Sequence, residues 1–347
     1  MKYRNRTVLR PLGPLGAVCL LLGIALLSLW ATGCSGEMYR PGEESLTLPP
    51  QESEPPTGER FELGEDVTDG SSDPYKDSPH VLRADFLETG ESDAILLQVD
   101  GTVILVDTGE TDDYGTISRC LHQYGISEID HLILTHFDKD HIGSAAAILQ
   151  NFGVKTVYLP DYVRDSSLYH RMMGVLELLP DTKIQRVTQE LAVDLTSSGD
   201  QDAPEGRMVI YPTALYEGGV TLGEDEENPI EENNFSLVIS ISFGQRSLLL
   251  MGDAEKDRIR EVAEVLGEEP RYDLVKIPHH GDYNKALREF LLPCKGLSYC
   301  VVHTSAPTEV EASLTALIQE VGAEAYFTYD GCVRFATDGE SMALMQD

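Results

Sequence analysis

Two histidines and two aspartates lie close together in the segment 136–141, as His136, Asp138, Asp140 and His141. Imidazole nitrogen and carboxylate oxygen are the ligands that hydrolytic sites offer to divalent metal ions. The apolar run Ile129–Leu134 precedes this segment and small residues follow it, which predicts a strand, a tight loop and a helix. Such a loop can point these side chains toward one centre, whereas a helix with this spacing cannot. We therefore interpret the segment as part of a metal site rather than as a solvated charged turn.

Two further loops carry possible ligands, and each follows an apolar run that is predicted to be a strand. Asp253 follows the run Ser247–Met251, and the pair His279-His280 follows the run Leu274–Ile277. A Gly-Asp turn is common and means little by itself, but three ligand-rich loops at strand ends favour one shared site. Together they supply seven candidate metal ligands: His136, Asp138, Asp140, His141, Asp253, His279 and His280.

The elements that must position these loops alternate between strand and helix from His80 onward. Asp100-Gly101 predicts a tight turn between two strands. This pattern predicts an α/β domain in which two sheets are faced by helices. The predicted strands include Val81–Leu87, Ala94–Val99, Thr102–Asp107, Thr156–Leu159, Met208–Tyr211, Phe235–Phe243, Ser298–Val302, Ala325–Tyr329 and Cys332–Ala336, and the predicted helices are Ile117–Tyr124, Gly143–Phe152, Ser166–Leu179, Lys256–Leu266, Lys285–Leu292 and Glu309–Val321.

The first 80 residues are predicted to target and tether the chain. A basic start and the uncharged run Leu15–Trp30 are typical of a signal peptide over residues 1–33. The following Ala31-Thr32-Gly33-Cys34 resembles a bacterial lipobox, with Cys34 as the lipidated residue. Residues 34–80 are rich in Pro, Glu, Ser and Gly, and we interpret them as an acidic tether that cannot bury a core. An uncleaved N-terminal anchor is the alternative for the first segment. Both interpretations place the body of the chain on the extracytoplasmic side of a bacterial membrane.

The net charge limits the substrates that the chain is expected to meet. The 347 residues include 26 Lys and Arg against 59 Asp and Glu, a formal charge of −33. A field of this sign repels phosphate backbones and argues against a broad groove for nucleic acid. Bound divalent ions would reverse the sign of this field locally, so the acidic composition does not exclude phosphodiester chemistry on a small molecule.

The segment from His136 to His141 resembles the His-x-Asp-x-Asp-His motif of the metallo-β-lactamase superfamily, in the branch found as the C-terminal domain of ComEC/Rec2 competence proteins. The resemblance implies a four-layer αββα sandwich, a single domain over residues 81–347, and hydrolysis by a hydroxide that bridges two metal ions. Further segments agree with the branch in order and spacing: Phe86–Ala94, Val106–Gly109, Asn233–Val238, Leu250–Ala254 and Val275–Gly281.

The resemblance also implies roles for the ligands of the first loops. His136 would bind the first metal, and Asp138 stands where many relatives have a second histidine. Asp140 and His141 would bind the second metal, and Asp253 would bridge the two. Asp140 is further predicted to be catalytic, because it could hold the attacking hydroxide and later protonate the leaving group.

One of His279 and His280 is expected to bind metal and the other to contact substrate or phosphate, and the sequence leaves open which. We name both as candidate ligands and His280 as a candidate catalytic residue. The third-histidine motif of true β-lactamases is missing. The branch's usual Gln-Gly pair is Glu91-Ser92 here, and its Ser after His-His-Gly is Asp282. The pocket therefore differs from the branch while the metal ligands are kept.

The ligand set predicts two divalent ions, Zn²⁺ or Mn²⁺, because three aspartates make the site rich in oxygen. The leading hypothesis is a membrane-anchored phosphodiesterase or phosphoesterase that acts on a small or cell-wall-derived ester, with extracellular DNA as a possible substrate and no protein partner. One alternative is a lactone, amide or β-lactam hydrolase of the same fold. Another is a non-catalytic lipoprotein for DNA uptake or surface binding.

Four cysteines lie beyond Cys34, namely Cys120, Cys294, Cys300 and Cys332. Disulfides are permitted outside the membrane, and a Cys294–Cys300 bond would close a small loop. The pairing stays open. No Cys-x-x-Cys occurs, so a thiolate zinc site is not expected.

Overall fold

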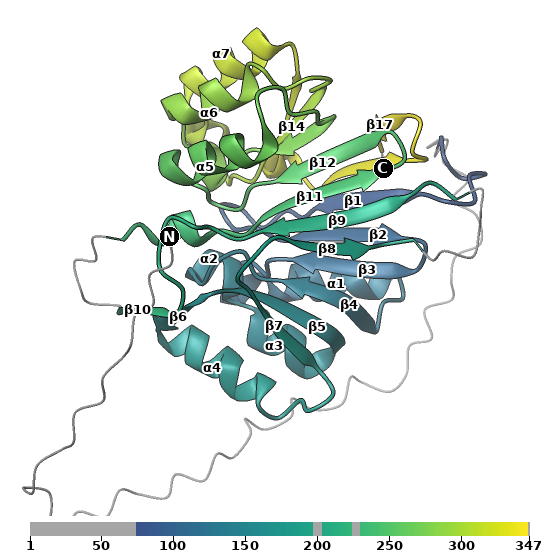
Figure 1. The fold of residues 1–347 in the computed structure, drawn as a ribbon. Helices are drawn as coiled ribbons and strands as arrows, with labels where there is room; N and C mark the ends of the chain where they lie inside the picture. The colour runs from purple at the N-terminus through teal and green to yellow at the C-terminus, as the bar shows by residue number, and fades with distance from the viewer. Residues whose placement is uncertain (1–73, 197–202, 224–229, 346–347) are drawn as a thin grey trace, which may run out of the picture. The chain divides into compact units, whose positions relative to one another are not determined.

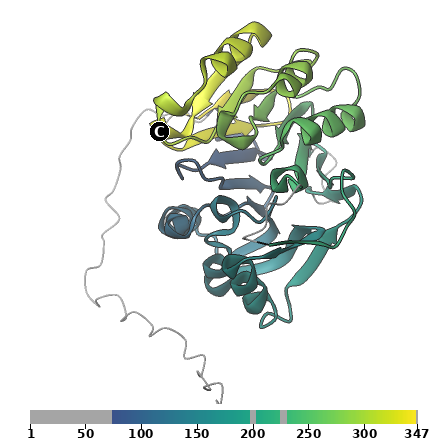
Figure 2. The ribbon, with the colours of Figure 1, turned by 90° about the vertical axis from the view of Figure 1, so that its left-hand side faces the viewer.

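The computed structural model describes residues 74–196, 203–223 and 230–345. These residues form two packed sheets with helices on both outer faces, so the predicted αββα sandwich is confirmed (Figure 1, Figure 2). The predicted signal peptide, the lipid site at Cys34 and most of the predicted tether lie outside the described residues. Within residues 34–80, Tyr75 is buried and its hydroxyl lies 3.1 Å from Ser341 Oγ.

The first sheet has the order β17-β16-β1-β2-β3-β4-β5-β7. The strands from β17 to β3 in this order pair antiparallel, with Asp100-Gly101 in the turn between β2 and β3, and the strands from β3 to β7 pair parallel. Its strands are β1 (Leu82–Phe86), β2 (Ile95–Val99), β3 (Thr102–Val106), β4 (Glu128–Ile133), β5 (Gly153–Pro160), β7 (Lys183–Val187), β16 (Val333–Thr337) and β17 (Met342–Leu344).

The second sheet has the order β15-β14-β13-β12-β11-β9-β8. Strands β12 to β15 are parallel, whereas β8, β9, β11 and β12 form antiparallel pairs. Its strands are β8 (Leu191–Asp194), β9 (Gly206–Tyr211), β11 (Val238–Phe243), β12 (Arg246–Leu250), β13 (Leu274–Lys276), β14 (Tyr299–Val302) and β15 (Glu324–Phe327). A small parallel pair, β6 (Tyr162–Asp165) with β10 (Val220–Gly223), lies apart from both sheets.

Alternating apolar residues along the strands create the layers, because successive side chains point to opposite faces of a sheet. On β2, Leu97 packs between the two sheets while Leu96 packs against helices. Helices α1 (Tyr114–Gln123), α3 (Ala145–Asn151) and α4 (Ser167–Leu176) cover the first sheet, and α5 (Lys256–Leu266), α6 (Lys285–Leu291) and α7 (Ala312–Val321) cover the second.

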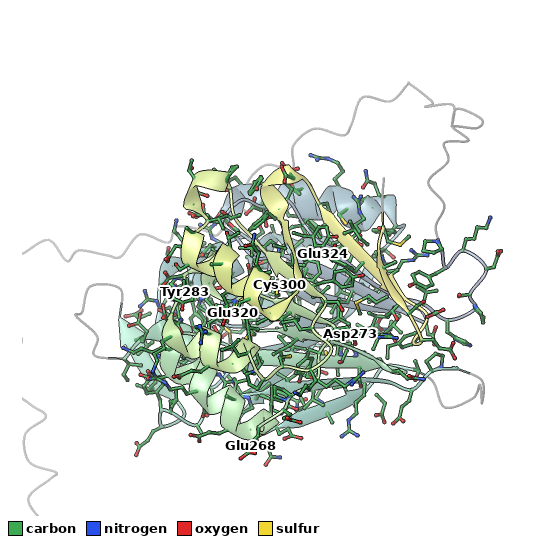
Figure 3. All side chains as sticks on the ribbon, turned by 90° about the horizontal axis from the view of Figure 1, so that it is seen from above. Glu268, Asp273, Tyr283, Cys300, Glu320 and Glu324 are labelled. Atoms are coloured by element: carbon green, nitrogen blue, oxygen red, sulfur yellow. The ribbon has the colours of Figure 1, made fainter. Side chains whose placement is uncertain are left out.

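The side of the molecule that carries α5, α6 and α7 has both acidic and basic side chains on these helices. Seen from above this side, Glu268, Glu320 and Glu324 are exposed, while Cys300 is fully buried on β14 (Figure 3). Cys294 and Cys300 are free thiols, so the bond considered between them is not formed. Among the described residues, no helix is both long and apolar enough to span a membrane.

Most predicted elements agree with the structure to within a few residues, and α5 agrees at both ends. Strands β6, β7, β8, β10 and β17 were not expected. The acidic stretch Glu217–Glu232 contains β10, and the short 3-10 helix η2 (Glu232–Phe235) begins at its last residue. These strands are short and half exposed, so their alternation of apolar residues is weak.

Candidate metal centre

The loop after β4 is held by a buried carboxylate that also reaches a histidine. Asp107 accepts hydrogen bonds from the backbone N–H and the hydroxyl of Thr135, at 2.8 and 2.7 Å. Its Oδ2 lies 2.9 Å from His141 Nδ1. This contact leaves Nε2 of His141 to face the site. A carboxylate behind a ligating histidine fixes the ring orientation and raises its basicity.

Four side chains from both sheets converge on one point. His141 belongs to the short helix α2 (Lys139–Ile142), Asp253 follows β12, and His280 lies in the 3-10 helix η3 (His279–Gly281) after β13. Asp253 Oδ2 lies 3.2 Å from His141 Nε2 and 3.1 Å from His280 Nε2. Asp140 Oδ2 lies 3.2 Å from His280 Nε2. One donor atom from each of these four residues lies within 4.8 Å of the others, a spacing suited to a shared metal ion.

His136 and Asp138 lie beside this cluster. His136 Nε2 is 3.6 Å from Asp138 Oδ2, and the His136 and His141 rings have centroids 4.0 Å apart. His136 is fully buried and its Nε2 has no hydrogen-bond partner among the described residues. The structure therefore brings six of the seven predicted ligands to one place.

The seventh predicted ligand, His279, points elsewhere. Its Nδ1 lies 2.8 Å from Glu255 and 3.8 Å from Asp282, and its Nε2 lies 3.3 Å from Asn233 Nδ2. The backbone at His279 and His280 has positive φ, 47° and 49°, which sends the two neighbouring rings to different partners. The geometry favours His280 as the ligand of this pair and leaves His279 at the edge of the site.

Gly252 lets Asp253 approach the first loop closely. Its φ is +51°, which favours glycine, and a Cβ there would lie 3.1 Å from the Cβ atoms of Thr135 and Ser236. Ser236 Oγ accepts a hydrogen bond from the Asp253 backbone N–H at 3.1 Å. The Gly-Asp turn, uninformative as a sequence pattern, is thus required by this close packing.

The structure also shows charged residues that the sequence reasoning missed. Lys276, fully buried on β13, contacts the Asp93 carboxylate and donates to Gly252 O at 3.0 Å. Its Nζ lies 3.6 Å from Asp253 Oδ1, so this oxygen faces the lysine while Oδ2 faces the histidines. His303, also fully buried, lies 3.3 Å from Asp93 Oδ1. In the sequence, the lysine inside the otherwise apolar run Leu274–Ile277 was the feature that could have indicated a buried ion pair.

The electrostatics of the cluster are those of cations and carboxylates in contact. Burial opposes ionisation of Asp253, but the imidazolium groups of His280 and His141 outweigh it and hold the pKa of Asp253 well below its usual range. Burial likewise opposes protonation of His280, yet Asp253 and Asp140 raise the pKa of His280 to about 10. Without a metal, protons on the two histidines thus occupy the place of a divalent cation.

A cavity of about 440 Å³ opens beside Asp140 and His280. This is within the size range of small-molecule sites. Carboxylates dominate its lining, so it is better suited to a small ligand than to a long polyanion. The cavity is lined by Thr89, Glu91, Ser92, Glu110, Asp112, Asp113, Lys139, Asp140, His280 and Ser305.

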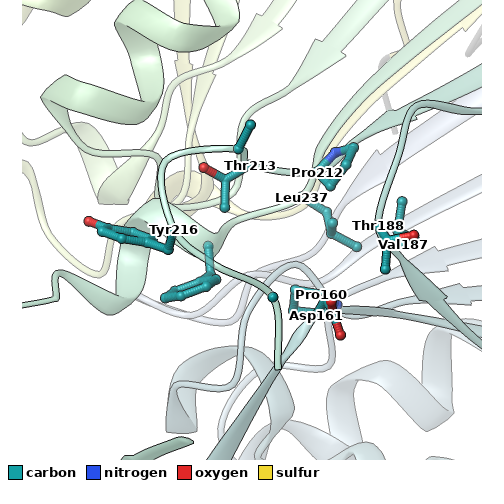
Figure 4. A pocket seen from close by; sticks show the side chains of 11 residues that line it. Pro160, Asp161, Val187, Thr188, Pro212, Thr213, Tyr216 and Leu237 are labelled. Carbon is teal, nitrogen blue, oxygen red and sulfur yellow. The ribbon is translucent and has the colours of Figure 1, made fainter. Parts of the chain in front are cut away.

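A second cavity, of about 260 Å³, contains none of the predicted site residues (Figure 4). Pro160 and Asp161 at the end of β5, Val187 at the end of β7 and Pro212 after β9 line it together with Leu237. None of the candidate ligands lines it, whereas Asp140 and His280 line the first cavity.

Residues 87–295 match the metallo-β-lactamase superfamily. The chain therefore belongs to this superfamily, a fold that usually binds divalent metal ions, and the predicted family is confirmed.

Among curated proteins, the chain is similar to ComE operon protein 3 of Bacillus subtilis (strain 168), with 26% identity over 60% of this chain and 26% of that protein. It is also 26% identical to Recombination protein 2 of Haemophilus influenzae, over 60% of this chain and 22% of that protein. The chain thus spans about a quarter of the length of these relatives. Among solved structures, a mutant CmlA β-hydroxylase is similar over 75% of this chain and 54% of its own, with 18% identity and a TM-score of 0.41.

Proposed function

We propose that this chain is a metal-dependent hydrolase of small phosphoesters, with phosphodiesters as the main substrates. The convergence of Asp140, His141, Asp253 and His280 beside an open cavity is the observation that carries the proposal. The competing lactone, amide or β-lactam hydrolase would use the same cluster. The oxygen-rich ligand set, with Asp138 in place of a histidine, supports phosphoester chemistry on Mn²⁺ or Zn²⁺.

The residues present fit a pair of divalent ions. Nε2 of His136 and Nε2 of His141 are buried without hydrogen-bond partners among the described residues. Such groups are costly to bury unless a cation or proton satisfies them. His136 and Asp138 would hold one ion, Asp140, His141 and His280 the other, and Asp253 would lie between them. Bound there, the ions would polarise an ester oxygen and lower the pKa of a coordinated water molecule.

Asp140 is the residue best placed to move a proton. Its side chain is 24% exposed, lines the cavity, and its Oδ2 contacts His280 Nε2. From this position it can accept a proton from an attacking water molecule and return it to the leaving oxygen. His280, Ser92 and Ser305 line the same cavity, and the Ser305 hydroxyl donates to Glu309 at 2.7 Å.

The lining of the cavity supports a small ester over long DNA. Glu91, Asp112 and Asp113 would repel the flanking phosphates of a polynucleotide, while one phosphodiester could be neutralised by the bound ions. A cell-wall-derived ester of modest size suits these constraints. The test is a panel of bis-p-nitrophenyl phosphate, nitrocefin and a lactone with the metal-loaded protein. Turnover of the phosphodiester is expected, and turnover of nitrocefin or the lactone alone would contradict the proposal.

We also infer that the chain is anchored to the extracytoplasmic side of a bacterial membrane through a lipid on Cys34. The apolar run before Cys34 and its lipobox-like residues support this. Replacing Cys34 by alanine is expected to abolish the incorporation of a labelled fatty acid into the protein. Unchanged labelling would contradict lipidation at this residue.

A further inference from the structure

The second cavity lies where strands of both sheets end. Pro160 is the last residue of β5 and Val187 the last residue of β7, and these two strands are parallel neighbours in the first sheet. Pro212 follows β9 of the second sheet, and Pro212 and Thr213 lie opposite Pro160 and Asp161 (Figure 4). The carboxyl ends of parallel strands are the usual place for ligands in α/β folds. The cavity therefore has the position of a binding site, although no candidate metal ligand lines it.

The walls of this cavity are mostly apolar, and two aromatic rings contribute to them. The rings of Tyr216 and Phe235 have centroids 4.8 Å apart, and Asn234 Nδ2 donates to the Tyr216 hydroxyl at 3.3 Å. Phe235 also stacks on the buried Tyr162, with centroids 4.3 Å apart. Such walls bind hydrocarbon, and aromatic faces also attract cations. The apolar lining consists of Pro160, Val187, Pro212, Tyr216, Phe235 and Leu237.

Asp161 is the charged residue of the lining. Its carboxylate forms no hydrogen bond or ion pair with another residue in the part of the chain that the structure describes. Arg186 donates to the backbone oxygens of Pro160 and Tyr162, at 2.6 and 2.5 Å, and to the Tyr169 hydroxyl at 2.6 Å. This guanidinium therefore holds the chain on both sides of Asp161 without pairing with its carboxylate. The carboxylate is available to a ligand.

The loop before β10 fixes the place of this carboxylate. A Cβ atom on Gly218 would overlap Asp161 Oδ2, so the glycine is needed for the carboxylate to lie there. The next residue, Gly219, donates its backbone N–H to the Asp161 backbone oxygen at 2.8 Å. Two consecutive glycines thus pack against Asp161 and hold it at the cavity.

We propose that the second cavity binds a small organic ammonium ion. The ammonium group would pair with the Asp161 carboxylate, and the hydrocarbon part would lie between the proline and aromatic rings of the lining. An ammonium ion needs one anionic partner and gains from nearby aromatic faces. The proposal goes beyond the proposed function and does not rest on it.

The same lining argues against other classes of ligand. The carboxylate would repel an anion, and one carboxylate supplies too few oxygen ligands for a divalent metal ion. A sugar needs several polar partners, but Thr213 Oγ1 already donates to Glu261 Oε2 at 2.8 Å and accepts from the Leu215 backbone N–H at 3.1 Å. One unpaired anionic group among apolar walls is the pattern that suits an organic cation.

The test is a calorimetric titration of the purified full-length protein with 2-phenylethylammonium, beside 2-phenylethanol, which has nearly the same shape and no charge. We expect the cation to bind at least about tenfold more tightly than the alcohol. Asp161→Asn should weaken binding of the cation by about tenfold and leave binding of the alcohol unchanged. Asp181→Asn is the matched control, because Asp181 is exposed and does not line the cavity. The control should bind the cation as the wild type does.

A second variant keeps the test informative if Asp161→Asn folds poorly. Gly218→Ala retains the negative charge but forces the Asp161 carboxylate to move, so it should also weaken binding of the cation. Equal affinities of the wild type for the cation and the alcohol would overturn the proposal. Wild-type affinity for the cation in a folded Asp161→Asn protein would overturn it as well.

A kinetic experiment distinguishes two sources of the ammonium group, a free molecule and the alcohol part of a substrate ester. Competitive inhibition of bis-p-nitrophenyl phosphate hydrolysis by 2-phenylethylammonium would indicate the ester, and unchanged hydrolysis would indicate a free molecule. The titration itself does not depend on turnover. A protein that binds the cation through Asp161 but cleaves no phosphodiester would therefore contradict the proposed function alone.

Discussion

His141 and Asp253 come from different sheets, yet His141 Nε2 lies 3.2 Å from Asp253 Oδ2. The first residue is delivered by the loop after β4 and the second by the turn after β12, so the contact ties together the edges of both halves of the sandwich. Because the candidate ligands come from both sheets, the proposed metal centre would depend on the whole fold. Removing the metals should therefore lower the stability of the described domain as well as its activity.

The two neighbouring histidines provide a direct test of the ligand assignment. Replacing His280 by alanine should remove at least one of two bound ions, because His280 Nε2 contacts both Asp140 and Asp253. His279→Ala should retain both ions, because the His279 ring contacts Glu255 instead. Metal content measured by elemental analysis of the two dialysed proteins checks this. Loss of an ion from His279→Ala only would reverse the assignment.

The carboxylate behind His141 should contribute to metal affinity without binding the metal. Asp107→Asn removes the negative charge 2.9 Å from His141 Nδ1 and should weaken metal binding by about 10-fold to 100-fold. Calorimetric titration with Zn²⁺ measures the change. Asp257→Asn is a suitable control, because Asp257 is exposed on α5 and pairs with Arg260. Equal affinities of the two variants would contradict the role of Asp107.

Metal binding should release protons near neutral pH. Burial lowers the pKa of His280 but Asp253 and Asp140 raise it more, to about 10, so His280 is protonated in the metal-free protein at pH 7. A metal requires the neutral ring, and affinity should therefore rise with pH from 6 toward 10, by up to about tenfold per unit for each proton released. Calorimetry in buffers of different ionisation enthalpy counts these protons. A count of zero at pH 7 would contradict the assignment of His280.

His303 should make the metal-free protein sensitive to acid. Burial lowers its pKa to about 4, whereas an unfolded histidine has a pKa of 6.5. The unfolded state therefore binds more protons between these values, and stability falls as the pH is lowered through this window. At pH 5 the protonation of His303 in the unfolded state lowers the free energy of unfolding by about 2 kcal/mol relative to pH 7.5.

The measurement for His303 is urea unfolding with a chelator present, on the wild type and His303→Leu. Because His141 and His280 also titrate, only the difference between the two proteins is informative. The wild type should lose about 2 kcal/mol more than the variant between pH 7.5 and 5. Parallel losses in the two proteins would show that His303 is not buried in its neutral form.

The sequence predicted the layers well because they follow from local patterns. Alternation on strands such as Ile95–Val99 and the helical spacing of Lys256–Leu266 are visible without a structure. The three ligand loops were likewise found, since each follows a buried strand. Strands β7 and β8 were missed because their half-exposed residues mix charged with apolar side chains, and long-range pairing stabilises them.

Features that depend on contacts between distant residues could not be predicted from the sequence. His279 and His280 have the same residue type and are adjacent, and only the left-handed backbone at both positions separates their directions. Glu232 lies in an acidic stretch, and nothing in the sequence indicated that its carboxylate would contact Tyr162 and Arg164. Lys276 lies in a predicted strand, but the sequence did not indicate which two aspartates, Asp93 and Asp253, it would approach.

The central claim is that the cluster around Asp140 cleaves phosphodiesters. It is tested most directly by hydrolysis of bis-p-nitrophenyl phosphate by the full-length protein loaded with Mn²⁺, beside Asp140→Asn loaded in the same way. We predict turnover by the wild type and a decrease of about 100-fold to 10,000-fold in kcat for the variant, because Asp140 would move the proton. A metal-loaded wild type without turnover, or an Asp140→Asn protein as active as the wild type, would contradict the claim.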